Sequence, residues 1–147
     1  MVAAFVAYAG HAGVTLVAAW FSVWSLPIGR TAAWVTGGAV MIVGAALYLA
    51  GRLEFRSFRL TWGLETSRLV TTGIYRRSRN PQTLGALFFL FGSGVAGRSG
   101  VALMLVAVLL LGSWVWLPIE ESVLEQVHGD AYARYRERTS RYLGRPR

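Results

Sequence analysis

The chain contains no cysteine and only two histidines, His11 and His128. Disulfide bonds and thiolate chemistry are therefore excluded. Neither histidine belongs to an HxxxH or HExxH pattern, so the sequence predicts no metal site. Lysine is absent too, and the net charge of +8 comes from 15 arginines set against seven acidic residues.

Charged side chains are missing from four long stretches, residues 1–29, 31–51, 80–97 and 99–119. Each is at or near the roughly 17–25 residues that a helix needs to cross a bilayer. A soluble four-helix bundle would carry a polar stripe on every helix, and these stretches offer little more than Ser, Thr, His and Gln. With 54% hydrophobic residues in 147, the chain is predicted to be one all-α, polytopic membrane domain.

Four transmembrane helices are predicted, at residues 3–25, 31–51, 81–96 and 101–117, and Pro118 is expected to end the last. The first stretch lacks the basic start of a cleaved signal peptide. The domain then divides into two N-terminal spans, a cytosolic connection, a transmembrane hairpin and a cytosolic or interfacial helical tail, at residues 1–51, 52–80, 81–117 and 118–147. Small residues of the hairpin should let its two helices approach closely; they are Gly85, Gly92, Gly94 and Gly112.

The arginines predict the orientation of these spans. Seven lie in residues 52–80 and six follow residue 117, whereas the other two connections hold one each, Arg30 and Arg98. Cytoplasmic connections are enriched in arginine and lysine, so both termini are expected in the cytoplasm of a bacterial inner membrane protein. Lipid phosphates beside the spans already account for these arginines, which makes nucleic acid an improbable partner.

The tail contains the residues best suited to binding or chemistry. Glu120 and Glu121 point about 100° apart on a helix, so at least one should meet an arginine or a cationic ligand. Farther on, a series of tyrosine and threonine residues and a series of arginines each recur at helical spacing. Together they predict one helix lying in the membrane interface. They are Tyr132, Tyr135, Thr139 and Tyr142, and beside them Arg134, Arg138, Arg141 and Arg145. Mid-span His11 is expected to bond to another helix rather than to act in catalysis.

Asn80 and Pro81 form a good start for the third helix, because Asn is favoured at the N-cap and Pro at the first helical position. Free backbone N–H groups and the positive end of the helix dipole lie there, flanked by Arg76, Arg77 and Arg79. This helix start is either an anion site at the membrane edge or an ordinary helix cap beside arginines that only set the orientation of the chain in the membrane.

The order of two motifs is more specific than either alone. "LVTTGIYRRSRNPQTLG" is similar to the pattern G-P-Y-R-x-x-R-(H/N)-P-x-Y-x-G. "PIEESVLEQVHGDAYARYRERTSRYLGRP" is similar to E-E-x-x-L-x-x-x-F-G-x-x-Y-x-x-Y-x-x-x-V-x-R-(F/Y)-x-P. On either side of a hydrophobic hairpin, they resemble the isoprenylcysteine carboxyl methyltransferase family and its bacterial relatives, within the wider group that includes phospholipid N-methyltransferases. The resemblance covers about residues 69–146.

This resemblance implies S-adenosylmethionine as methyl donor, bound on the cytosolic side, and a lipophilic prenyl or lipid-like acceptor that enters from the bilayer. It places Arg79 and Asn80 at the reacting site and Arg141 at the final arginine of the second motif. The positions that it assigns to the donor are Tyr75, Arg79, Asn80, Pro81, Glu120, Glu121, Tyr132 and Tyr135.

The chain also departs from the family pattern. Departures occur at Ile74, Thr83 and His128, and Trp116 stands where a basic residue is common. The family pattern allows His or Asn at this position, and this chain has Asn80. Because asparagine does not titrate, a general base is not expected there. A carboxylate acceptor needs no base at neutral pH, which favours isoprenylcysteine-type O-methylation. Alternatives are N- or S-methylation of a phospholipid or small molecule, an NADPH-dependent sterol-type reductase, and a membrane accessory protein without enzyme activity.

Overall fold

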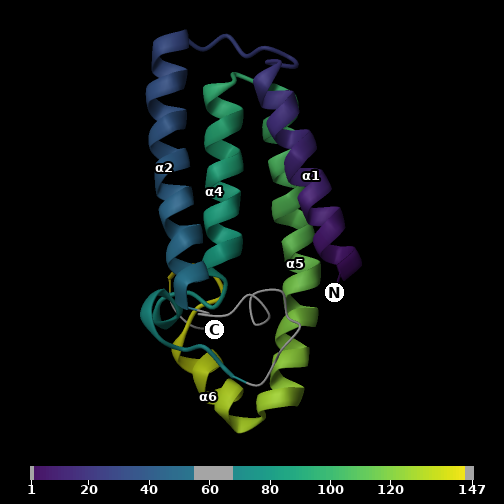
Figure 1. Cartoon of the computed structure of the whole chain (residues 1–147), viewed down its shortest axis with the longest axis vertical. Helices are drawn as coiled ribbons and strands as arrows, with labels where there is room; N and C mark the ends of the chain where they lie inside the picture. The colour runs from purple at the N-terminus through teal and green to yellow at the C-terminus, as the bar shows by residue number, and fades with distance from the viewer. Residues whose placement is uncertain (1, 55–67, 145–147) are drawn as a thin grey trace. The chain divides into compact units, whose positions relative to one another are not determined.

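The computed structural model describes residues 2–54 and 68–144, with side chains from Val6 onward. Figure 1 shows a wholly helical arrangement, and the described residues contain no strand, only an isolated bridge between Ser25 and Ser99. Five α-helices and one short 3₁₀ helix are described, and the predicted all-α class is confirmed. They are α1 (Val2–Trp20), α2 (Arg30–Glu54), η1 (Gly73–Arg76), α4 (Pro81–Ala96), α5 (Gly100–His128) and α6 (Asp130–Arg138).

Two of these helices, α2 and α5, are long and apolar enough to cross a membrane. Two shorter apolar helices are Val6–Trp20 and Pro81–Ala96. A helix of 16 residues such as α4 is about 24 Å long, below the roughly 30 Å of a hydrocarbon core. By length and composition, the described residues therefore support two of the four expected spans.

Helix ends differ from the prediction at the first connection. The first helix stops at Trp20, not near residue 25, and Ser22 and Trp24 take positive φ angles of 49° and 55°. A left-handed backbone cannot continue a right-handed helix, so the chain turns before it reaches Pro27. By contrast, the third helix spans Pro81–Ala96 as predicted.

Pro118 does not end the fourth helix, and that prediction was wrong. It lies inside α5, which continues for ten more residues to His128. Proline in a helix interior removes one backbone hydrogen bond and costs about 3 kcal/mol. The helix is held in the fold on both sides of the proline, since Leu117 is fully buried and Glu121 pairs with Arg79 and Arg141.

The chain forms two compact units, the first comprising Met1–Ala46 and Gly85–Gly112. In it α2 and α4 run side by side (Figure 1), with backbones in contact. A Cβ on Gly92 would lie 2.6 Å from the Gly37 oxygen. Gly85 and Gly92 therefore serve the α2–α4 contact, not the predicted hairpin. Gly94 does face the hairpin partner, since a Cβ there would lie 2.8 Å from Leu103.

Two further contacts hold the first unit together. His11 on α1 bonds to the Leu105 carbonyl of α5 with an Nε2–O distance of 2.8 Å, which confirms the predicted interhelical bond. At the connections, the Leu26 N–H donates to the Arg98 carbonyl at 2.7 Å and Arg98 Nη2 donates to the Leu26 carbonyl at 3.0 Å. The connection after α1 and the turn before α5 are thus joined to each other.

Candidate functional site

The second compact unit comprises Leu47–Leu84 and Ser113–Arg147, and it brings the two sequence motifs into contact. The segment 77–80 before α4 lies along the segment 139–141 after α6. The Arg79 N–H donates to the Ser140 carbonyl at 2.9 Å, and the Ser140 hydroxyl donates to the Arg77 carbonyl at 3.2 Å. Asn80 and Ser78 side chains both donate to the Arg141 carbonyl, at 3.2 and 3.3 Å.

A buried carboxylate lies beside these paired segments. Glu121 on α5 accepts from Arg79 Nη2 at 3.0 Å and from Arg141 Nη2 at 2.7 Å. The side chains of Arg79 and Glu121 are only 7% and 9% exposed, whereas Arg141 is 34% exposed. Of the two adjacent glutamates, one was predicted to meet an arginine, and Glu121 meets two.

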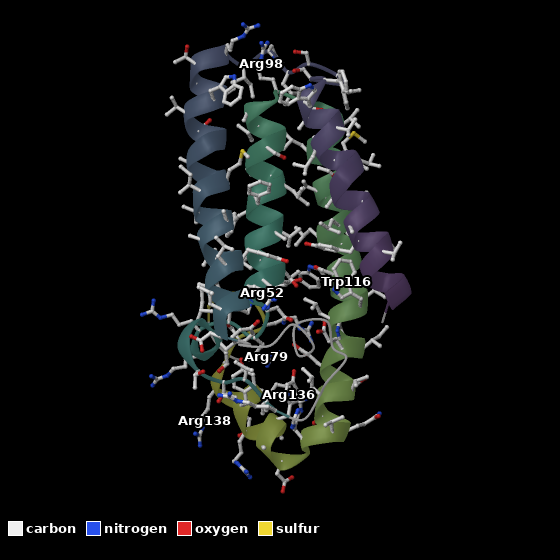
Figure 2. All side chains as sticks on the ribbon, viewed as in Figure 1. Arg52, Arg79, Arg98, Trp116, Arg136 and Arg138 are labelled. Atoms are coloured by element: carbon white, nitrogen blue, oxygen red, sulfur yellow. The ribbon has the colours of Figure 1, made fainter. Side chains whose placement is uncertain are left out.

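Every nitrogen of the Arg79 guanidinium has a protein partner. Nε and Nη2 bond to Glu121, and Nη1 donates to the carbonyls of Arg136 and Thr139 at 3.0 and 3.1 Å. Figure 2 shows Arg79 and Arg136 in this part of the molecule. Because guanidinium has five donors in a fixed plane, these bonds fix its orientation. Arg79 therefore links the start of α4 to α5 and to the end of α6.

Glu120 differs sharply from its neighbour. Its side chain is exposed, and within residues 6–54 and 68–144 it forms no hydrogen bond or ion pair. Glu121 instead pairs with both Arg79 and Arg141. It therefore does not need the basic side chain that is common in the family at the position of Trp116. A free carboxylate next to a neutralised one is available to a cationic or hydroxyl-bearing ligand.

Tyr75 belongs to η1, whose first residue is a glycine with a left-handed backbone. Gly73 has φ of +54°, and a Cβ on it would overlap the carboxylate of Glu54. The Tyr75 ring is 7% exposed, its hydroxyl accepts from Gln82 Nε2 at 3.1 Å, and its carbonyl accepts from the Tyr135 hydroxyl at 2.7 Å. The first motif, the start of α4 and α6 thus meet at one tyrosine.

Tyr132 and Tyr135 pack edge to face on α6, with ring centroids 6.1 Å apart and planes at 67°. Tyr132 is 1% exposed, and its hydroxyl has no hydrogen-bond partner in the described chain. Burial raises the pKa of the Tyr75, Tyr132 and Tyr135 phenols well above the ordinary value, so all three remain protonated at neutral pH. A buried hydroxyl without a partner is costly, and a bound ligand would satisfy it.

The tail helix is shorter than the sequence pattern predicted. Helix α6 ends at Arg138, because Thr139 is extended with φ −131° and ψ 128°. Tyr142 therefore leaves the helix, and its hydroxyl bonds to the Ser113 hydroxyl. The prediction of one continuous interfacial helix was therefore wrong from Thr139 onward, and Arg145 lies outside the described residues.

The start of α4 combines the expected backbone with unexpected side-chain partners. The Leu84 N–H donates to the Asn80 carbonyl at 3.0 Å, so the helix begins where predicted, with Pro81 buried in its first turn. The Asn80 amide, however, donates to the Arg141 carbonyl. With Arg79 also engaged, one of the three arginines expected to flank an anion at this helix start is taken by Glu121 and the tail.

Sequence reasoning did not identify the small polar residues that join the motifs. Ser78, Thr139 and Ser140 are 1%, 4% and 5% exposed, and Gln82 positions the Tyr75 hydroxyl. One signal was present: each paired segment contains a serine between arginines, in "RRSRN" and "RTSRY". Serine there satisfies backbone groups of the opposite segment where a larger side chain would not fit.

A family model described as phospholipid methyltransferase matches residues 32–131, from the start of α2 to the start of α6. No curated protein and no solved structure matches the chain. The match indicates a membrane methyltransferase, and the described residues contain no group of three or more His, Cys, Asp or Glu side chains that could hold a metal ion.

Proposed function

This chain belongs to the phospholipid methyltransferase family, and we propose that it transfers a methyl group from S-adenosylmethionine to a lipophilic acceptor at the cytosolic face of a membrane. The observation that supports a site in the second unit is the buried Arg79–Glu121–Arg141 cluster, which joins the two motifs on which the family resemblance depends. The methyltransferase family also argues against the reductase and the non-enzymatic accessory protein.

The residues present fit such a donor in part. Glu120 offers a carboxylate for its ammonium group or ribose hydroxyls, and the buried Tyr132 hydroxyl has no hydrogen-bond partner in the described part of the chain. Arg79 and Glu121 neutralise each other and are better suited to positioning than to contact with the donor. When bound, the sulfonium donor supplies an electrophilic methyl group with a good leaving group. The protein then has mainly to orient the reactants and exclude water.

A carboxylate is the acceptor group that we favour, as in isoprenylcysteine O-methylation. Proton removal is unnecessary for a carboxylate at neutral pH, since its pKa is about 4. Asn80 cannot act as a base, and its amide is engaged by the Arg141 carbonyl. The Tyr75, Tyr132 and Tyr135 phenols have pKa values raised by burial, so they are not bases either.

A second candidate acceptor is the amine of a phospholipid headgroup, which the description of the matching family favours. An amine is protonated at neutral pH and must lose a proton before it can attack a methyl group. The exposed Glu120 carboxylate has no hydrogen-bond or ion-pair partner among the described residues, and it is the group that could attract the ammonium and accept that proton. Glu120 would then act both in binding and as a base.

The acceptor is identified by transfer of a labelled methyl group. Membranes of expressing cells are incubated with methyl-labelled S-adenosylmethionine, and the lipid extract is analysed by mass spectrometry before and after mild base. We expect a label that base releases as methanol, because methyl esters hydrolyse and methylated amines do not. A base-stable label in the headgroup would instead identify the amine as the methyl acceptor.

The proposed topology has four spans with both termini in the cytoplasm. It is supported by the thirteen arginines of the second unit's segments against the two at Arg30 and Arg98. Because the chain has no cysteine, single Gly29→Cys and Glu137→Cys variants can be labelled in intact cells with an impermeant maleimide. Only Gly29→Cys should react, and labelling of Glu137→Cys instead would reverse the orientation.

A further inference from the structure

The connection between α1 and α2 begins with three large aromatic side chains that are mostly exposed. Trp20, Phe21 and Trp24 are 83%, 72% and 65% exposed, and we call these three residues the aromatic edge. No charged side chain precedes Arg30 in the sequence. Exposed aromatic side chains that cluster in this way mark a contact with a partner or with a membrane. The proposed methyl transfer involves no residue of this connection.

The backbone of the connection is extensively hydrogen-bonded within the first unit. Five N–H groups donate to carbonyls of the chain at 2.7–3.1 Å, and they belong to Phe21, Ser22, Val23, Leu26 and Ile28. Carbonyls are bonded too: the Ser99 hydroxyl donates to that of Val23 at 2.8 Å, and the Gly100 N–H donates to that of Trp24 at 3.0 Å. A loop in water can leave such groups to the solvent, whereas a segment in a membrane must satisfy them internally.

The conformation of the connection is costly and is held by its neighbours. Ser22 and Trp24 have φ angles of 49° and 55°, in the left-handed region that bulky side chains disfavour most. A Cβ on Gly100 would lie 2.9 Å from Cε3 of the Trp24 ring, so this ring packs on the backbone at the start of α5. The ring is therefore fixed in position although most of the residue is exposed.

The aromatic edge continues the exposed side of α1. The Phe21 N–H donates to the Val17 carbonyl at 3.0 Å, so Phe21 keeps the helical spacing for one residue beyond the end of α1. Val14 and Val17 lie seven and four positions before it, hence on the same face, and both are exposed. In the proposed topology α1 is a membrane span, so these valines face lipid and Phe21 follows them towards the membrane surface.

We propose that the aromatic edge lies in the bilayer, at the boundary between the hydrocarbon core and the headgroups. Tryptophan is enriched at this depth because its ring is largely apolar and also carries one polar N–H. The bonded backbone allows the segment to leave water without unpaired polar groups. Arg98, at this end of the first unit in Figure 2, adds to this by donating Nε and Nη2 to the Leu26 carbonyl. The edge is thus a lipid-contacting surface and not part of an aqueous loop.

This inference goes beyond the proposed function, because it uses only residues of the first unit. It holds whichever acceptor is methylated, and it holds in either orientation of the chain in the membrane. The membrane contact and the methyl transfer can therefore fail separately.

The test uses the full-length protein reconstituted in dioleoylphosphatidylcholine vesicles, with a nitroxide spin label on one introduced cysteine. Trp20→Cys and Phe21→Cys report on the edge, while Trp24 stays in place because its ring packs on Gly100. Glu137→Cys, at an exposed position of α6, is the aqueous control. Paramagnetic resonance measures collisions of the label with oxygen, which partitions into lipid, and with a water-soluble nickel chelate. Labels on the edge should collide more with oxygen than with nickel, and the control label should show the reverse.

Two results would overturn the proposal. Nickel access at Trp20→Cys and Phe21→Cys equal to that at Glu137→Cys would assign the edge to an aqueous loop. Protection from both oxygen and nickel would show that a second copy of the chain or another protein covers it. S-adenosylhomocysteine should bind the Trp20→Cys and Phe21→Cys variants as it binds the parent. If the parent does not bind it while the edge labels report lipid, the proposed function fails and the membrane contact stands.

Discussion

Replacing Glu121 by Gln removes the counter-charge of a buried arginine without changing the size of the side chain. Arg79 is 7% exposed, and Glu121 is its acidic partner in the fold. In the variant, the Arg79 guanidinium keeps its bonds to the carbonyls of Arg136 and Thr139. Its positive charge, however, stays buried beside a neutral amide.

The size of the effect follows from burial. Breaking a buried ion pair by removing one partner costs about 3–5 kcal/mol, whereas an exposed pair contributes about 0–1 kcal/mol. The same helix supplies the matched control, because Glu125 pairs with Arg136 and both side chains are 41% exposed. Glu121→Gln should therefore lower the free energy of unfolding by about 3–5 kcal/mol, and Glu125→Gln by about 1 kcal/mol at most.

The assay is unfolding in mixed micelles, in which an anionic detergent is titrated into non-ionic detergent and helicity is followed by circular dichroism. The two variants have the same chemical change, the same helix and the same loss of charge. A double variant, Glu121→Gln with Arg79→Gln, should recover part of the lost stability, because no buried charge then remains unpaired. Equal unfolding midpoints for Glu121→Gln and Glu125→Gln would refute the reasoning.

Three other outcomes are expected. Gly129→Ala should lower the unfolding midpoint, because Gly129 combines a φ of 52° with a ψ of −130°, a conformation that costs a residue with a side chain about 1–3 kcal/mol; an unchanged midpoint would contradict this. Tyr132→Phe should leave stability unchanged or raised, because the lost hydroxyl has no hydrogen-bond partner within residues 6–54 and 68–144, while S-adenosylhomocysteine binding measured by calorimetry falls about tenfold. Stability should decline as pH rises above about 10. Burial raises the pKa of Tyr75 in the folded protein, so near this pH its phenol ionises only in the unfolded chain. Melting curves recorded at different pH values should show a shallower decline in Tyr75→Phe.

The helical class and the start of the third helix could be read from the sequence because both depend on local signals. Uncharged apolar runs predict helices, and Asn80–Pro81 predicts where α4 begins. Local signals failed at Pro118, where burial of Leu117 and the ion pairs of Glu121 hold the helix on either side of the proline. They also failed at Thr139, where bonds to residues about 60 positions earlier replace the helix.

The candidate site was predictable only in outline. Two adjacent glutamates at the end of an apolar helix imply that one meets an arginine, and the structure identifies it as Glu121. Which arginines pair depends on how α5, α6 and the segment before α4 meet, and spacing along the chain does not contain that information.

The central claim is that the two motifs together form a site for a methyl donor. Its most direct test is calorimetric titration of the purified full-length protein in detergent with S-adenosylhomocysteine, alongside Glu120→Gln. We expect saturable binding to the parent and weakening of about tenfold or more in the variant. The variant keeps its fold because Glu120 has no hydrogen-bond or ion-pair partner in the part of the chain that the structure describes. Absence of binding to a folded parent would contradict the account.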